Sequence, residues 1–309
     1  MIQATAPAKI ILLGEHAVVY GQPAIAIPVS HLRATASVEA NGMGNGLQIV
    51  ASDLGITLSV NKTGASDDPL YAIVRQVLNM WGVAPPDLRI IIKSDIPVAS
   101  GLGSGTAISA VLARALAAAI GRPLDNQTLN ELVYQVEKLH HGSPSGVDNT
   151  VVVYERPVYF VRGRDIDFFA VKGQFHFLIG DTGIAALTRD TVGDVNSLYQ
   201  ARPDHYQRIF NAIGTLAMQA RTALKTGSPL QLGMLMNQNH VYLQELTVSS
   251  LELDRLVNAA RAAGALGAKM SGGGRGGNMI ALVSEEMLAD VRSALMAAGS
   301  VRVFDAVLT

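Results

Sequence analysis

The chain has 309 residues, 49% of them apolar and 16% charged, with a formal net charge of −1. These values exclude a disordered chain, and they exclude recruitment of nucleic acid or an anionic membrane by a global positive charge. The chain contains no cysteine, which excludes disulfides, thiolate metal sites and a cysteine nucleophile. The length predicts one large domain or two medium ones.

The N-terminal residues lack the basic start and the apolar core of a signal peptide. The longest helical apolar stretch, Thr106 to Ile120, is about one turn too short to span a bilayer and contains Arg114. We therefore expect a cytoplasmic protein that has no membrane partner.

The first part of the chain is expected to form strands, because its apolar segments are short and one of them alternates with polar residues. Strands are expected at 9–13, 24–29, 33–39 and 88–93. Three glycines and two asparagines between residues 41 and 46 indicate a turn. The first helix is expected to begin at Pro69, with Asp67 or Asp68 as its cap, and to end at Gly82.

Helical periodicity follows in an Ala- and Leu-rich segment at 108–120 and again at 126–139, where Gly142 is expected to end the helix. Further helices are expected at 188–200, 204–226, 230–243, 250–266 and 285–298. Further strands are expected at 150–154, 158–161, 175–179, 279–283 and 301–307. Strands that cluster, instead of alternating strictly with helices, indicate an α+β fold. We place the domain boundary near residue 170, which separates residues 1–170 from residues 171–309.

The segment from Ser100 to Thr106, with the sequence SGLGSGT, joins a predicted strand to a predicted helix. Glycines let the backbone approach a phosphate closely, and the free N–H groups at a helix start face the anion. The segment therefore favours binding of nucleotide phosphates, with the Ser104 hydroxyl as a magnesium ligand, although it is not a Walker A sequence. The alternative is a tight turn in which Ser104 or Thr106 only caps the helix.

Polar residues interrupt the first apolar run, where Lys9 stands at the strand start and Gly14-Glu15-His16 follows. Burial of Glu15 and His16 without partners is costly, so we expect each to have a partner. The functional interpretation places both side chains on hydroxyl or carboxylate groups of a substrate. The alternative is an exposed loop between two strands.

Two carboxylates lie eleven positions apart, Glu137 near a helix end and Asp148 after a Gly- and Pro-rich loop. Glu137 is a candidate magnesium ligand, because magnesium takes a few oxygen ligands together with phosphate oxygens and water. Asp148 is a candidate acceptor for the proton of an attacking hydroxyl. The alternative is a surface glutamate and an aspartate that serves only as a turn residue.

The segment from Lys269 to Asn278 contains five glycines in the six positions 272–277. Glycine loses more conformational entropy on ordering than other residues, so this density favours a second loop that faces phosphate or substrate. The alternative is a flexible hairpin connection.

Together these segments resemble the motifs of the GHMP kinase family, and they occur in the family's order. Pro7 to Gly21 resembles the first motif, Ser100 to Ser104 the phosphate loop, His141 to Asn149 the segment with the catalytic aspartate, and Lys269 to Gly277 the third motif. The resemblance covers most of the chain and is greatest to the mevalonate kinase branch. It implies a two-domain GHMP kinase fold, with a ribosomal-protein-like α+β domain followed by a ferredoxin-like domain.

The resemblance also implies roles for the matching residues. Asp148 would act on the substrate hydroxyl with Lys9 beside it, and Ser104 and Glu137 would bind magnesium. The acceptor would contact Glu15, His16 and Thr188. The phosphates of ATP would contact Ser100, Gly101, Leu102, Gly103, Ser104, Gly105, Thr106 and Gly273.

The implied activity is ATP-dependent phosphorylation of mevalonate to 5-phosphomevalonate in isoprenoid precursor biosynthesis, with Mg²⁺ and with a homodimer as one possible assembly. Three alternatives stay open: a phosphomevalonate kinase, a mevalonate kinase that uses another hydroxyl, and a nucleotide-binding regulator without catalysis. The chain also departs from the family. Gly105 replaces a second serine, residues 185–187 lack a basic residue and a serine that some relatives have, and Arg275 interrupts the third glycine run. We expect Arg275 to lie near the substrate or the phosphates, and the alternative is that it faces solvent.

Overall fold

The computed structural model describes residues 2–51, 53, 55–60, 68–98, 100–141, 144–186 and 188–309. These residues fall into two compact units. The first unit contains the residues up to Ala8, Ser30–Pro97 and Gly103–Glu155, and the second contains Lys9–Val29, Val98–Leu102 and Arg156–Thr309. Two long strands, β1 (Ile2–Leu13) and β2 (Ala24–Ala40), contribute residues to both units. The domain boundary near residue 170 stays a prediction.

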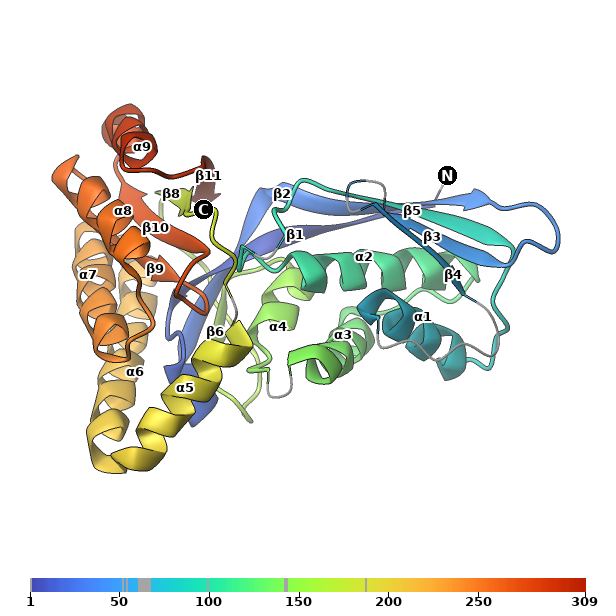
Figure 1. The fold of residues 1–309 in the computed structure, drawn as a ribbon, viewed down its shortest axis with the longest axis horizontal. Coiled ribbons are helices and arrows are strands. Elements are labelled where there is room, and N and C mark those ends of the chain that lie inside the picture. Colours follow the sequence, from blue (N-terminus) through green and yellow to red (C-terminus); the bar gives the residue numbers. More distant parts are fainter. Residues whose placement is uncertain are drawn as a thin grey trace. The chain divides into compact units, whose positions relative to one another are not determined.

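The first unit contains a sheet in the order β4-β3-β5-β2. Strand β5 (Leu88–Ser94) runs antiparallel to the second half of β2 and parallel to β3 (Leu47–Ala51), and β4 (Ile56–Val60) pairs antiparallel with β3. Along β3 every second side chain is buried, as expected where one face of a strand meets a core. Four helices lie along one face of these strands (Figure 1): α1 (Pro69–Met80), α2 (Ser104–Ala119), α3 (Asn126–His141) and α4 (Val147–Tyr154).

The predicted starts of α1 and α3 agree with the structure, whereas α2 begins at Ser104, four residues before the predicted start. Helix α1 begins at Pro69, and the carboxylate of Asp68 accepts a hydrogen bond from the Leu70 N–H at 2.8 Å, so Asp68 is the cap. The apolar face predicted for α3 is buried, as expected: Leu129, Leu132, Val133 and Val136. Asp67 and Gly142, named in the predictions, lie outside the described residues.

The strand predicted at 150–154 is wrong, because these residues form the second half of α4. Gly146, with φ of 93°, turns the chain into the helix, and the Thr150 hydroxyl donates to the Gly146 carbonyl at 2.7 Å. Val151, Val152 and Val153 are completely buried, so packing overrides the strand propensity of the valines. The two strands predicted at 24–29 and 33–39 are one continuous strand, β2.

The second unit contains a four-stranded antiparallel sheet in the order β11-β8-β10-β9. Its strands are β8 (Phe175–Asp181), β9 (Gly267–Ser271), β10 (Asn278–Val283) and β11 (Arg302–Leu308). Helix α8 (Leu251–Ala262) comes between the first two strands and α9 (Leu288–Ala297) between the last two, and both helices contact the sheet. This order and connection are those of the ferredoxin-like fold predicted for the C-terminal part.

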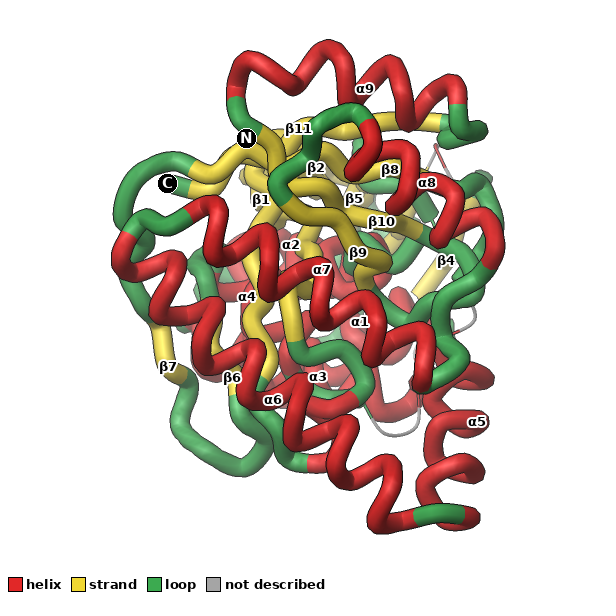
Figure 2. Tube along the Cα trace, turned by 90° about the vertical axis from the view of Figure 1, so that its left-hand side faces the viewer, coloured by secondary structure: helices red, strands yellow, loops and turns green. Residues whose placement is uncertain are grey.

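Further helices belong to this unit, and two of them, α6 (Pro203–Thr226) and α7 (Pro229–Glu245), lie side by side (Figure 2). Two short strands, β6 and β7, pair with each other, and β6 also pairs with the start of β2. The elements are η1 (Ala17–Tyr20), β6 (Val158–Phe160), β7 (Asp167–Phe168), α5 (Thr188–Ala201), α6 (Pro203–Thr226), α7 (Pro229–Glu245) and η3 (Glu285–Met287).

The core of the second unit joins helices α6 to α9 to the sheet, and it includes Phe210, Leu243, Leu256, Met270 and Leu295. Helix α7 approaches β9 closely because glycines face each other there. A Cβ atom on Gly233 would lie 2.3 Å from the Leu266 carbonyl oxygen, and one on Gly267 would lie 2.5 Å from the Gly233 Cα. This contact places the side chains of α7 next to those of β9.

Within the described part of the chain, every helix is either too short or too polar to cross a membrane.

Candidate active site

The phosphate loop is divided between the two units, with Ser100–Leu102 in the second and Gly103–Thr106 in the first. Gly103 adopts φ of 78°, which favours glycine, and turns the chain into α2. Gly103 is the N-cap of α2 and has no side chain with which to bind the first N–H groups of the helix, as expected where a helix start binds an anion. The alternative in which Ser104 or Thr106 caps α2 is therefore wrong.

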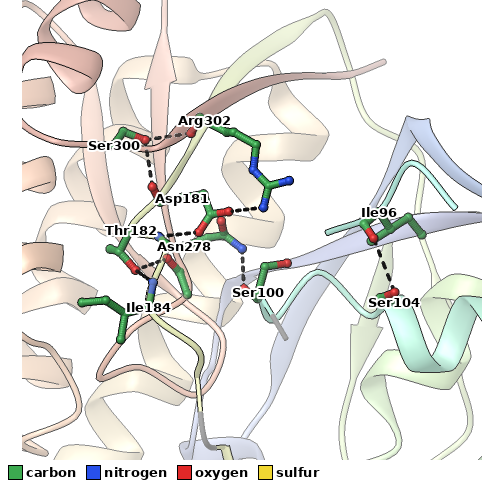
Figure 3. Close-up of polar contacts among 11 residues, drawn as sticks. Ile96, Ser100, Ser104, Asp181, Thr182, Ile184, Asn278, Ser300 and Arg302 are labelled. Carbon is green, nitrogen blue, oxygen red and sulfur yellow. Dashed lines mark hydrogen bonds and ion pairs between the residues drawn. The ribbon is translucent and has the colours of Figure 1, made fainter. Parts of the chain in front are cut away.

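The hydroxyls of the loop point to other partners. The Ser104 hydroxyl donates to the Ile96 carbonyl at 3.5 Å (Figure 3), and the Thr106 hydroxyl donates to the Glu137 carboxylate on α3 at 2.7 Å. Ser104 and Thr106 are buried, whereas Glu137 is half-buried. Glu137 is thus connected to the first turn of α2, next to the predicted magnesium ligand Ser104.

These residues fit a magnesium ion by their donor chemistry. The first turn of α2 carries the hydroxyls of Ser104 and Thr106, and Thr106 binds the Glu137 carboxylate; magnesium takes oxygen ligands of these kinds together with phosphates and water. The described residues contain no group of three His, Asp or Glu side chains that would hold a metal ion by themselves. A magnesium site that nucleotide phosphates complete agrees with the oxygen donors at α2 and with the lack of such a group.

Asp148 lies in the first turn of α4 and is half-buried. A carboxylate in a first helical turn interacts favourably with the helix dipole. The next residue, Asn149, is buried, and its amide donates to the Asn130 side chain of α3 at 2.7 Å. This contact fixes α4 on α3 and holds the backbone of Asp148. Residues 142 and 143 of the preceding motif lie outside the described residues.

In the second unit, the loop after β1 holds Glu15 and His16 inside the protein. Their exposed fractions are 1% and 6%, so the alternative of an exposed loop is wrong. Gly14 adopts φ of 101°, and a Cβ there would lie 2.4 Å from the Ala24 Cα, so only glycine fits. His16 also has a positive φ, 59°, which is uncommon for a residue with a side chain.

Both buried residues have the partners that their burial predicts. The Glu15 carboxylate forms an ion pair with the Lys269 ammonium on β9, and it accepts a hydrogen bond from the Asn239 amide on α7 at 3.1 Å. The His16 Nε2 donates to the Gly273 carbonyl, with 3.0 Å between the atoms, because a carbonyl can only accept.

Burial lowers the pKa of His16 from 6.5 to about 4, and the positive charges of Arg275 and Lys269 contribute to this shift. The hydrogen bond to Gly273 opposes it. The imidazole is therefore neutral near pH 7 and carries its proton on Nε2, which leaves Nδ1 as a hydrogen-bond acceptor.

The glycine-rich loop connects β9 to β10 and contacts the other motifs of the second unit. A Cβ on Gly273 would lie 2.6 Å from the Thr188 hydroxyl oxygen, and one on Gly277 would lie 2.8 Å from the Ser100 carbonyl oxygen. The buried Asn278 amide donates to that same Ser100 carbonyl (Figure 3). The loop is thus a hairpin connection, and it also packs against the first half of the phosphate loop.

Lys9 joins this group through its backbone. Its N–H donates to the Leu102 carbonyl at 2.9 Å, and the residue is 3% exposed. The structure therefore brings together Lys9, His16, Thr188, Gly273 and Ser100–Leu102 in the second unit. It brings together Ser104, Thr106 and Glu137 in the first. The pairing of Lys9 with Asp148, which belong to different units, stays a prediction.

Arg275 has its own set of partners. Its guanidinium forms an ion pair with Asp194 on α5 and donates to the Thr247 carbonyl at 3.1 Å, and its N–H donates to the Val248 carbonyl at 2.7 Å. Its φ of 55° places it in the left-handed region. Arg275 thus connects the glycine-rich loop to α5 and to the segment after α7.

Asn239, Lys269 and Asn278 are among the residues at these contacts for which the sequence predicted no role. Lys269 had one visible signal, since a charged residue stands between apolar neighbours in a strand-like segment. Asn239 and Asn278 gave no such signal, because asparagine is equally common on surfaces and in turns.

Comparison with known proteins identifies this arrangement. The family model described as GHMP kinases N terminal domain matches residues 68–156, and the one described as GHMP kinases C terminal matches residues 220–300. A protein of Thermococcus sibiricus named mevalonate kinase is 35% identical, over 96% of this chain and 93% of that relative. One of Aeropyrum pernix with the same name is also 35% identical, over 92% and 89% of the two chains.

Solved structures agree with the sequence relatives. The crystal structure of Methanococcus jannaschii mevalonate kinase matches with a TM-score of 0.86 and 26% identity, over 99% of this chain and 98% of that one. The L. major mevalonate kinase in complex with R-mevalonate matches with a TM-score of 0.85 and 27% identity, over 99% and 95%. The predicted two-domain fold and the family resemblance are confirmed: the chain belongs to the GHMP kinase family.

Proposed function

We propose that this chain transfers the terminal phosphoryl group of ATP to the primary hydroxyl of mevalonate, which yields 5-phosphomevalonate for isoprenoid precursor biosynthesis. One observation carries the proposal: relatives named mevalonate kinase are 35% identical over almost the whole chain. The same fold in a structure that contains R-mevalonate supports the choice of acceptor.

The nucleotide phosphates are assigned to the start of α2, where Gly103 is the N-cap, to the backbone from Ser100 to Thr106, and to Gly273. Phosphoryl transfer needs mainly positioning and charge neutralisation from the protein. Backbone amides fixed at the start of a helix meet that need without reorganisation.

Ser104 and Glu137 are the residues that would hold magnesium, with the Thr106 hydroxyl fixing the Glu137 carboxylate. Bound magnesium would supply charge neutralisation at the phosphates. In this proposal the chain's own contribution is a rigid set of oxygens, because α2 and α3 are linked directly at Thr106 and Glu137.

Asp148 is assigned to accept and orient the attacking hydroxyl, and Lys9 to sit beside it and stabilise the developing alkoxide. Asp148 lies on the short helix α4, and the next residue, Asn149, is hydrogen-bonded to α3. This contact limits the movement of Asp148. Because orientation contributes much of the rate in such transfers, a fixed carboxylate suits this role.

The acceptor is assigned to His16, Thr188 and Glu15. The Nδ1 of neutral His16 accepts a hydrogen bond, so it suits a hydroxyl of mevalonate. Thr188 is exposed at the start of α5 and lies against Gly273. Glu15 already binds Lys269 and Asn239, so its contribution to acceptor binding runs through the position of its neighbour His16.

The alternatives have weaker support. A phosphorylated acceptor would need additional positive charge, and the basic residue expected to supply it, Arg275, is paired with Asp194. The Streptococcus pneumoniae phosphomevalonate kinase is 17% identical, which shows a common fold only. The expected homodimer and the cytoplasmic location remain predictions.

An acceptor screen tests the proposal. The purified chain with ATP and magnesium is offered mevalonate, phosphomevalonate, homoserine and galactose, and ADP release is measured. We expect turnover with mevalonate at least a hundredfold above that with the other three. Preferred turnover of phosphomevalonate, or ATP binding without ADP release for any acceptor, would replace the proposal with one of the alternatives.

A further inference from the structure

The ion pair between Lys269 and Glu15 is the most deeply buried pair of charges among the described residues, with both side chains at 0% exposure. The Lys269 ammonium also donates to the Met270 carbonyl at 2.6 Å. Removing two charges from water carries a large desolvation cost, which the attraction between them often only offsets. The pair is therefore a weak source of stability, and its effect is better sought in geometry.

The pair joins three separate elements. Glu15 lies in the loop after β1, Lys269 on β9 and Asn239 on α7, and Asn239 is completely buried. One Glu15 oxygen binds the Lys269 ammonium and the other binds the Asn239 amide. A carboxylate held at both oxygens, from two directions, has one orientation.

The chain from β1 to His16 and the chain from β9 to the glycine-rich loop are connected at further points. The Ser271 hydroxyl donates to the Ile11 carbonyl at 2.8 Å, and His16 donates to the Gly273 carbonyl at 3.0 Å. The end of β1 and the loop after it are thus attached to β9 and the glycine-rich loop by a row of contacts with Lys269 at its start. His16 sits at the other end, on backbone with an uncommon positive φ.

We propose that Lys269 is a positioning residue for phosphoryl transfer: its charge fixes the Glu15 carboxylate, and Glu15 in turn fixes His16 against the glycine-rich loop at Gly273. This inference rests on the proposed function for its kinetic consequence. Its structural consequence, the fixed His16 side chain, does not depend on the identity of the acceptor.

Two variants separate positioning from stability. Lys269→Met leaves the Glu15 charge buried without its partner, which is strongly destabilising. The double variant Lys269→Met/Glu15→Gln removes both charges at nearly constant volume, so its melting temperature is expected to return close to that of the wild type. If the pair mattered only for stability, activity would return with it.

The test measures kcat, KM for mevalonate, and exchange of the His16 Nε2–H with solvent by NMR, for the wild type and the double variant. We expect kcat at least tenfold lower, KM at least tenfold higher and proton exchange at least tenfold faster in the double variant. Leu295→Ala, in the core of the same unit, is the control for stability loss and is expected to keep all three values within threefold.

A stable double variant whose kinetics and exchange rate stay within threefold of the wild type would overturn the proposal. A double variant that does not fold would overturn it too, since the pair would then be essential for stability. A wild type that is inactive on mevalonate contradicts the proposed function instead, and the exchange rate of the His16 proton then decides the positioning role alone.

Discussion

Two buried histidines, His16 and His240, contribute to the response of this protein to acid. Burial lowers the pKa of His240 from 6.5 to about 4, as it does for His16, and the charge of Arg261 acts in the same direction while Asp254 opposes it. The His240 Nδ1 accepts from the Met270 N–H at 3.3 Å, so its Nε2 donates to Asp254 at 3.1 Å. Both imidazoles are therefore neutral in the folded protein.

These shifts predict a loss of stability in acid with a definite sign. In the unfolded chain these imidazoles bind protons near pH 6.5, whereas in the folded chain they do so only near pH 4. Their contribution to stability is therefore fully present above pH 6.5 and is lost as the pH falls from 6.5 toward 4. At about pH 4 each histidine has lost roughly 3 kcal/mol of stability, because a pKa shift corresponds to about 1.4 kcal/mol per pKa unit.

The measurement is the free energy of unfolding in urea from pH 7.5 to 4.5. We expect the free energy of unfolding of His240→Gln to fall less steeply with decreasing pH than that of the wild type. His31 is exposed, and His31→Gln is expected to follow the wild-type slope. Equal slopes for all three proteins would mean that the buried imidazoles bind protons as readily as they do in the unfolded chain.

Sequence reasoning at this scale worked where the signal was local. The cap of α1 was narrowed to Asp67 or Asp68 because both stand just before Pro69, and Glu15 and His16 were expected to have partners because of their polarity. It did not identify Lys269 and Asn239 as those partners of Glu15. They lie more than two hundred positions away from Glu15, and only the folded chain brings them together.

At the scale of elements, the contact between α7 and β9 depends on two glycines. Gly233→Ala would place a Cβ 2.3 Å from the Leu266 carbonyl oxygen, and this backbone atom cannot move away cheaply. We expect the variant to lose about 1–3 kcal/mol of stability, as overpacked sites do.

Gly193→Ala in α5 is the matched control, because no atom lies within 4 Å of a Cβ added there. It is expected to gain about 0.5–1 kcal/mol from helix propensity. Urea denaturation of Gly233→Ala and Gly193→Ala measures both changes in stability. If they changed stability equally and in the same direction, the close packing of α7 on β9 would not be the cause.

Element prediction succeeded for amphipathic helices and failed where propensity and packing disagree. Residues 150–154 contain three consecutive valines, which favour a strand, yet Gly146 and the burial of all three valines make them helical. Strand β2 was divided in two by the polar residues at 30 and 31. They are exposed side chains on a strand that continues past them.

At the scale of the whole molecule, four short motifs were sufficient to predict the family and the fold class, because their order along the chain is itself informative. The division of the motifs between the two units could not be predicted. The phosphate loop changes unit between Leu102 and Gly103, and no composition shift marks that point. The relation between Lys9 and Asp148 is therefore a matter for experiment.

Asp148→Asn tests the catalytic role assigned to the Asp148 carboxylate. The substitution removes the carboxylate that is assigned to the acceptor hydroxyl, but it keeps the size of the side chain. We expect kcat to fall at least a thousandfold, because proton acceptance and orientation are both lost. The affinity for ATP, measured by calorimetry, is expected to stay within threefold.

The most direct measurement is ³¹P NMR of the reaction of this chain with ATP, magnesium and mevalonate. The account predicts one new phosphomonoester on the 5-oxygen, formed in equal amount with ADP, and no such signal from Asp148→Asn over the same time. A phosphoester on the 3-oxygen, ADP without a phosphoester, or an undiminished signal from Asp148→Asn would contradict it.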